Sequence, residues 1–227
     1  TPSHWLGDML QNSKLLSHQS YTVIPNPINL KIFKPTNKRA SREEFNLPLD
    51  KKIILFGAVD SNSNINKGLH LLLKAIDKFA LIEDPKKVHL VIFGNNKQVT
   101  MSFKCSYTSI GFLDDETSVA RLYNAADVFV CPSIIESLGY TCIEAISCGV
   151  PVVAFATGGI PDVVKHKKNG YLAESFNTQD FALGMQYVLN YSDSTLSENA
   201  RKYAIAKFDQ ETIVRQYILL YKSIIDR

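Results

Sequence analysis

The sequence predicts a doubly wound α/β domain built on a parallel sheet, and three observations support this prediction. Short runs that are almost wholly apolar and rich in β-branched residues recur along the chain, as in strands that a parallel sheet buries on both faces. Stretches with helical patterns separate these runs, which is the alternation expected of such folds. The 227 residues are 45% hydrophobic and 21% charged, which suffices for one large core.

The apolar runs predict the strands in chain order. The stronger runs are YTVIP (21–25), KIILFGA (52–58), VHLVIFG (88–94), DVFVCPS (127–133) and VPVVAF (150–155), and the weaker ones are SYTSIGF (106–112) and NGYLA (169–173). Between the first two runs, prolines at 27, 35 and 48 indicate a linker over residues 26–50.

Helices are predicted between and after these strands, near 67–82, 116–125, 138–148, 159–166, 177–190, 195–207 and 210–226. The acidic residues 114–116 suit the start of the second helix, and Pro161 suits the first turn of the fourth. The last helix carries a stripe of apolar residues at helical spacing. The stripe consists of Ile213, Val214, Tyr217, Leu220, Tyr221 and Ile224.

The composition argues against several classes of function. A formal net charge of +3 suits an anionic ligand but is too weak to indicate nucleic-acid binding. The four cysteines form no CxxC pair and have no metal-ligand spacing with the histidines, which predicts reduced core cysteines and a cytoplasmic protein. The sequence has no D-x-D motif for a catalytic metal and no G-x-G-x-x-G after residues 52–58 for a dinucleotide dehydrogenase. The sequence contains no run of about 18 apolar residues, the length that a membrane-spanning helix needs.

The loop at 132–139 is the first candidate site, because ligands of such sheets bind beyond the carboxyl ends of the strands. Ser137 is predicted to cap the helix that follows. The backbone N–H groups of Leu138, Gly139 and Tyr140 would then point outward at a positive helix end, which suits a phosphate. The alternative is an ordinary capped helix that binds nothing.

Two carboxylates, Glu136 and Glu144, flank this helix start. Glu144 lies about two turns into the predicted helix, roughly 8–9 Å beyond the cap, a plausible distance from a diphosphate to the ribose of the same nucleotide. Its carboxylate would accept hydrogen bonds from the two ribose hydroxyls. Glu136 would face the group on the other side of the diphosphate. The alternative is that both glutamates are merely solvated.

These motifs, taken in order, closely resemble the donor-binding domain of retaining GT-B glycosyltransferases of family 4, also called group 1. The resemblance rests on E-x7-E at 136–144, followed by GVPVVAF, GGIPDVV and NGYL. Upstream, IPNPINLKIFKP resembles the start of that domain, TPSHWL resembles the tail of a preceding domain, and KG at 67–68 resembles a phosphate-contacting lysine motif.

The resemblance implies a Rossmann-like domain that forms the C-terminal half of a GT-B architecture. The expected parts are the tail of a missing N-terminal domain with the crossover (1–25), the linker (26–50), the nucleotide-sugar domain (51–208) and a helix returning toward the cleft between domains (209–227). A whole protein of this kind takes an NDP-sugar donor and a saccharide or lipid-linked acceptor, works without a metal or other cofactor, and contacts the inner face of the membrane peripherally.

The resemblance also implies roles for individual residues. Glu144 would bind the ribose, and Glu136, taken as the catalytic residue, would bind the donor sugar. The amides of Leu138, Gly139 and Tyr140, with Lys67, would hold the diphosphate of a UDP- or GDP-sugar. The remaining predicted site residues are Gly111, Phe112 and Leu113, which would flank the base, and Asn26, which would lie near the cleft.

One departure from the family concerns the cations at the diphosphate. The family often has an arginine right after the glycine that ends the first strand, but here Ala58 follows Gly57 and a longer loop leads to Lys67. Lys67 acts alone, or loop amides and asparagines substitute, or Lys67 is only a solvated lysine. Two other functions stay open within this architecture, a sugar-nucleotide epimerase and a non-catalytic nucleotide-binding module.

Overall fold

A computed structural model describes residues 1–57, 64–94 and 102–226, and it contains a six-stranded sheet in which every pairing is parallel. The strands are β1 (Lys52–Gly57), β2 (Val88–Phe93), β3 (Ser106–Gly111), β4 (Val128–Cys131), β5 (Val152–Phe155) and β6 (Gly170–Ala173). Their order in the sheet is β3-β2-β1-β4-β5-β6. The predicted doubly wound α/β fold is therefore confirmed.

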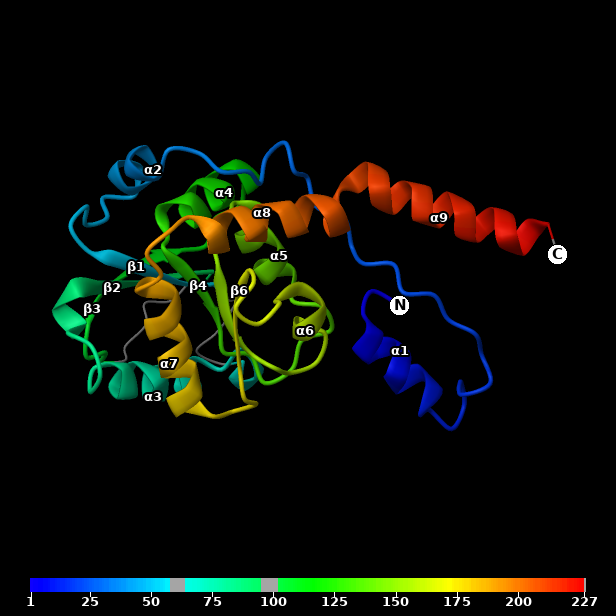
Figure 1. Cartoon of the computed structure of the whole chain (residues 1–227), viewed down its shortest axis with the longest axis horizontal. Helices are drawn as coiled ribbons and strands as arrows, with labels where there is room; N and C mark the ends of the chain where they lie inside the picture. The colour runs from blue at the N-terminus through cyan, green and yellow to red at the C-terminus, as the bar shows by residue number, and fades with distance from the viewer. Residues whose placement is uncertain (58–63, 95–101, 227) are drawn as a thin grey trace.

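Helices cover both faces of the sheet (Figure 1). On one face lie α4 (Glu116–Ala125), α5 (Tyr140–Ser147) and α8 (Thr195–Phe208), and on the other lie α3 (Leu69–Phe79) and α7 (Thr178–Leu189). The shorter or peripheral helices are α1 (His4–Gln11), α2 (Lys38–Glu44), α6 (Ile160–Val163), α9 (Gln210–Ile225) and the 3₁₀ helices η1 (Ile65–Lys67) and η2 (Pro85–Lys87).

Burial of both faces explains why the strands are so apolar. All six residues of β2 are buried, and so are the four residues of β4 and of β5. Alternate side chains of one strand enter different cores: Leu55 packs with the α4–α5–α8 layer, and Ile54 packs with the α3–α7 layer. A strand that fills two cores at once needs an unbroken apolar run.

The strand order reverses direction between β1 and β4. From β1 the chain first adds β2 and β3 on one side, and then returns to place β4 on the other side. Ile54 of β1 consequently pairs with Leu90 of β2 and with Val128 of β4. In open α/β sheets, ligands bind outside the carboxyl ends of the strands at such a switch point.

The structure departs from the sequence prediction mainly before residue 51. Residues 21–25 form no strand; the Ile24 N–H donates to the Thr1 carbonyl at 2.9 Å instead, because no strand of the sheet lies alongside. The stretch 26–50, predicted as a linker, contains α2 and packs on the domain through the buried Ile28 and Phe33. Helix α1 was not predicted.

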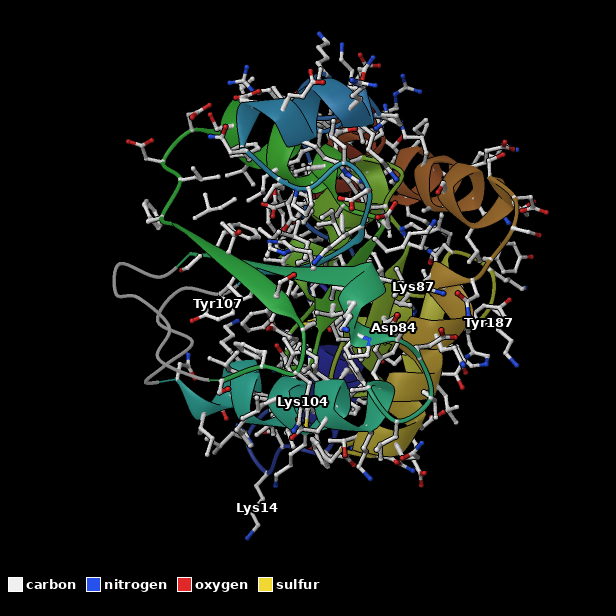
Figure 2. The ribbon with its side chains drawn as sticks, turned by 90° about the vertical axis from the view of Figure 1, so that its left-hand side faces the viewer. Lys14, Asp84, Lys87, Lys104, Tyr107 and Tyr187 are labelled. Carbon is white, nitrogen blue, oxygen red and sulfur yellow. The ribbon has the colours of Figure 1, made fainter. Side chains whose placement is uncertain are left out.

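The edge strand β3 and the helix α9 are the most exposed elements that bear on function. Figure 2 faces the β3 edge, with α2 above the strand and α3 below it. Helix α9 projects from the body (Figure 1), and of its residues only Ile213 is buried. Within the described ranges, no helix combines the length and the apolar character needed to cross a lipid bilayer.

Candidate functional site

Lys67 and Glu136 meet at the switch point between β1 and β4. Lys67 ends η1, and Gly68 follows with a φ of 72° in the left-handed region. A Cβ at Gly68 would collide with the Pro132 carbonyl oxygen, so only glycine lets the η1 turn approach the loop after β4 this closely. The Ile134 N–H also donates to the Asn66 carbonyl at 2.8 Å. These contacts hold the two loops side by side.

The Glu136 carboxylate has two donors on one oxygen. Lys67 Nζ lies 2.8 Å from Oε1 in an ion pair whose side chains are 32% and 16% exposed. The buried Ser133 hydroxyl donates to the same oxygen at 2.9 Å. Lys67 is therefore not a freely solvated lysine, and Glu136 is held in place at the mouth of the loop.

The GGIPDVV segment braces the Glu136 loop from the other side. The Gly159 N–H donates to the Glu136 carbonyl at 2.8 Å, and the Thr157 hydroxyl donates to the Ser133 carbonyl at 3.1 Å. A Cβ at Gly158, where φ is 54°, would collide with that Glu136 carbonyl oxygen. The backbone of the loop after β5 is thus locked to the backbone of the loop after β4.

Helix α5 begins without a side-chain cap. Its N-cap is Gly139, with a φ of 83°, and no side chain accepts a hydrogen bond from the first turn. The prediction that Ser137 caps this helix was wrong, because the left-handed Gly139 starts the helix two residues later. Instead, the Ser137 carbonyl accepts a hydrogen bond from Ser3 Oγ at 2.5 Å.

The missing cap leaves donors at the start of α5 unpaired. Within the described residues, no hydrogen-bond acceptor contacts the backbone N–H groups of Leu138, Gly139, Tyr140 and Thr141. The Leu138 side chain is buried, whereas that of Tyr140 is exposed and donates to the Pro27 carbonyl at 3.0 Å. Unpaired N–H groups at a positive helix end form an anion-binding arrangement.

Glu144 lies on the same helix, partly buried. It is the fifth residue of α5, about 7.5 Å along the axis from Gly139, which is closer than the two turns predicted. The Tyr123 hydroxyl donates to Glu144 Oε2 at 2.8 Å. Burial raises the pKa of Glu144 to about 7; the bond from Tyr123 opposes this rise, and the charge of Glu116 adds to it.

The remaining predicted residues are linked to α5 only through their neighbours in the chain. Gly111 ends β3 with a φ of 83°, Phe112 is 54% exposed, and Leu113 packs on the core. The loop they form leads to Glu116, whose charge acts on Glu144 and on Tyr140. Asn26 is exposed and precedes Pro27, the acceptor of the Tyr140 hydroxyl.

Two side chains of this site were missed by sequence reasoning, namely Ser133 and Tyr123. Ser133 had a recognisable signal, because it lies at the end of a buried strand three residues before Glu136. Tyr123 had no such signal, since an aromatic residue on an amphipathic helix is ordinarily a core residue.

Two other predictions concern the ions at the site. Residues 58–63, which would have to be seen to decide what replaces the missing arginine, lie outside the described residues. Among those described, no three His, Cys, Asp or Glu side chains converge as metal ligands do.

Comparison with known proteins assigns the family. Residues 37–207 match the family described as Glycosyl transferases group 1. The chain belongs to this glycosyltransferase family. One relative is an uncharacterized glycosyltransferase of Methanocaldococcus jannaschii, 30% identical over 185 residues that cover 76% of this chain and 45% of the relative. Another is a D-inositol 3-phosphate glycosyltransferase of Streptosporangium roseum, 33% identical over 70% of this chain and 39% of the relative.

Solved glycosyltransferase structures share the fold of the whole chain. A sucrose-phosphate synthase from Thermosynechococcus elongatus superposes with a TM-score of 0.83 at 27% identity, covering 100% of this chain and 58% of the other. HepE of Anabaena, solved in complex with UDP and glucose, superposes with a TM-score of 0.77 at 21% identity, covering 98% and 62%. This glycosyltransferase chain thus has the fold of one half of a GT-B protein, and it spans less than half the length of the two curated relatives named above.

Proposed function

We propose that this domain binds the nucleotide-sugar donor, a UDP- or GDP-sugar, of a retaining hexosyltransferase that needs no metal or other cofactor. One observation carries the proposal. Two partly shielded carboxylates, Glu136 and Glu144, flank a helix start whose N–H groups are unpaired within the described residues, and a lysine lies beside one of them at the switch point.

The diphosphate is assigned to the start of α5 and to Lys67. The unpaired N–H groups of Leu138, Gly139 and Tyr140 would donate hydrogen bonds to the phosphate oxygens, and the helix dipole would favour the negative charge of the phosphate. An ammonium has three donors, so Lys67 can keep its bond to Glu136 and still donate to phosphate. These groups would stabilise the charge that develops on the leaving diphosphate.

The two carboxylates are assigned to the two ends of the donor. Glu144 would accept hydrogen bonds from the ribose hydroxyls, because it lies about one turn further along the helix than the unpaired amides. Glu136 would contact the donor sugar, because it precedes the helix start that would hold the diphosphate, whereas Glu144 follows it. The Gly158–Gly159 turn holds the backbone of the Glu136 loop in place. The base would lie against Gly111, Phe112 and Leu113, with Asn26 at the rim.

A structural relative supports a nucleotide-sugar ligand. HepE of Anabaena has been solved with UDP-glucose as well as with UDP, and this chain shares its fold with a TM-score of 0.74 against the UDP-glucose complex. The relatives named as D-inositol 3-phosphate glycosyltransferases act on an acceptor that their name states. For this protein we propose a saccharide or lipid-linked acceptor.

The whole enzyme is proposed to be longer than this chain. Transfer needs donor and acceptor held together, and the acceptor would bind to an N-terminal domain that the curated relatives have room for. We place the enzyme in the cytoplasm, with peripheral contact at the inner face of the membrane. The isolated domain would bind the donor and transfer no sugar.

Titration calorimetry with UDP, GDP, ADP and their sugars tests the proposal. We expect one nucleoside diphosphate to bind, and Lys67→Ala to weaken its binding. Lys87→Ala is a matched control, because Lys87 also ends a 3₁₀ helix but precedes the amino end of β2, whereas the candidate site lies beyond the carboxyl ends of the strands. A folded protein that binds none of these nucleotides, or that loses affinity equally in both variants, contradicts the proposal.

A further inference from the structure

We propose that Tyr123 is a positioning residue for Glu144, whose hydroxyl holds one carboxylate oxygen and leaves the other for the ribose of the donor. This inference rests on the proposed function and deepens it. The Tyr123 hydroxyl donates to Oε2 at 2.8 Å, and no hydrogen bond to Oε1 is formed within the described residues. The contact joins two helices, since Tyr123 lies on α4 and Glu144 on α5.

The Tyr123 ring is buried between two aromatic side chains of the sheet. The residue is fully buried, with its ring edge-on to Phe93 at 5.8 Å between centroids and to Phe129 at 5.3 Å. These phenylalanines belong to β2 and β4, so the ring is wedged against the sheet. A ring held in this way has one direction for its hydroxyl, and a buried hydroxyl needs a partner. Glu144 is that partner, and its carboxylate is oriented as a result.

The same bond favours the charged form of the carboxylate. Burial raises the pKa of Glu144 to about 7, and the Tyr123 bond lowers it. The ionised form is the useful one, because a carboxylate accepts both bonds of a vicinal diol, whereas a carboxylic acid carries a proton on one oxygen. Without the Tyr123 hydroxyl, a larger share of the protein would carry a neutral Glu144 near pH 7.

Among the described residues, no cation acts on the Glu144 carboxylate. The titratable groups that interact with it are Glu116 and Tyr123 of α4, Tyr140 and Cys142 of α5, and Cys148 at the C-cap of α5. On α8, Arg201 acts on the Cys148 thiol and donates to the backbone carbonyls of Phe33 and Ser147. Tyr123 is therefore the donor that stabilises the charged form.

Glu136 shows the same arrangement independently. Its Oε1 receives the buried Ser133 hydroxyl, as Glu144 Oε2 receives that of Tyr123. Each of the two carboxylates is thus tied to a buried hydroxyl through one oxygen. A carboxylate that is merely solvated needs no such tie.

The first test needs no ligand. In protein labelled with ¹³C at the glutamate side chains, NMR gives the titration midpoint of Glu144, assigned with Glu144→Gln. We expect Tyr123→Phe to raise this midpoint by about one pH unit, the size of a lost hydrogen bond to a charged group. We expect 3-fluorotyrosine at position 123, a stronger donor in the same place, to lower it. An unchanged midpoint in both proteins overturns the inference.

The second test measures nucleotide affinity against pH. With UDP and GDP as probes, we expect Tyr123→Phe to bind about tenfold more weakly near pH 6. The difference in affinity should narrow to less than about twofold above pH 8, as Glu144 becomes ionised in both proteins. A purely structural effect would lower affinity by the same factor at every pH, and this outcome also overturns the inference. Tyr203→Phe is the control: Tyr203 lies on α8, and its hydroxyl donates to the Asp162 carbonyl at 2.8 Å.

The two proposals fail in different ways. A wild-type protein that binds no nucleoside diphosphate refutes the proposed function, and with it the ribose as the ligand of Glu144. If the wild type binds UDP or GDP but the titration midpoint of Glu144 is the same in the wild type and in Tyr123→Phe, only the positioning role is refuted.

Discussion

Replacing Glu144 by glutamine should make the protein more stable at neutral pH. The native carboxyl has a pKa of about 7 against an ordinary value of 4.5, with burial as the first cause. A shift of this size corresponds to about 3 kcal/mol between the protonated and the ionised form. The native state binds this proton more tightly than the unfolded chain does. The stabilisation that this proton gives to the native state is therefore fully present below pH 4.5 and is lost as the pH rises through about 7.

Glutamine removes the charge but keeps an acceptor for the Tyr123 hydroxyl. We therefore expect Glu144→Gln and the wild type to unfold alike near pH 4.5, and the variant to gain up to about 3 kcal/mol at pH 8. For a domain of this length the gain corresponds to roughly 6–12 °C in the unfolding midpoint. Urea unfolding at pH 4.5, 6 and 8 measures it. A stability difference that does not change between pH 4.5 and pH 8 would refute the reasoning.

Four further predictions concern the ligand and the backbone. Glu144→Ala should weaken nucleotide binding by about 1.5–3 kcal/mol in calorimetry, the scale of lost charged hydrogen bonds, and Glu144→Gln by less; unchanged affinity in both would exclude the ribose contact. Glu136→Ala should weaken binding of the sugar nucleotide more than that of the bare diphosphate, and equal losses would move its role to the nucleotide. Lys67→Ala should weaken binding of the diphosphate far more than that of the nucleoside, with a modest salt dependence in the wild type that the variant loses; a silent variant would point to the loop amides. Gly139→Ala should cost about 1–2 kcal/mol in thermal unfolding because of its φ of 83°, and a neutral outcome would show that the turn relaxes.

The fold was predictable because most of the inner strands of its sheet are buried on both faces. An apolar run such as VHLVIFG can be buried on both faces only inside the sheet, and β2 lies there, between β3 and β1. The stretch YTVIP has similar composition but forms no strand, because pairing depends on a neighbour that the sequence does not reveal. Likewise, the start of α5 is set by the left-handed Gly139 packed against Ile160, a contact between distant residues.

The candidate site was predictable as a set of residues but not as a network. The positions of Glu136 before and Glu144 after a helix start follow from the spacing in the chain itself. The bond of each carboxylate to its buried hydroxyl does not: Tyr123 reaches Glu144 from another helix, where only the packing of α4 against α5 and the sheet brings them together. The ion pair of Lys67 with Glu136 depends in the same way on two loops that meet at the switch point.

That ion pair links ligand binding to the assembly of the middle of the sheet. Lys67 follows β1 and Glu136 follows β4, and β2 and β3 lie between them in the chain. The two side chains come within 2.8 Å only when β1 and β4 have paired, so the site forms with the most non-local strand pairing at the centre of the molecule. A ligand that bridges both loops would bind only the paired state and would stabilise it by mass action. If β1 and β4 pair slowly during folding, nucleotide binding would appear with the same delay. The donor would then report when these two strands have paired.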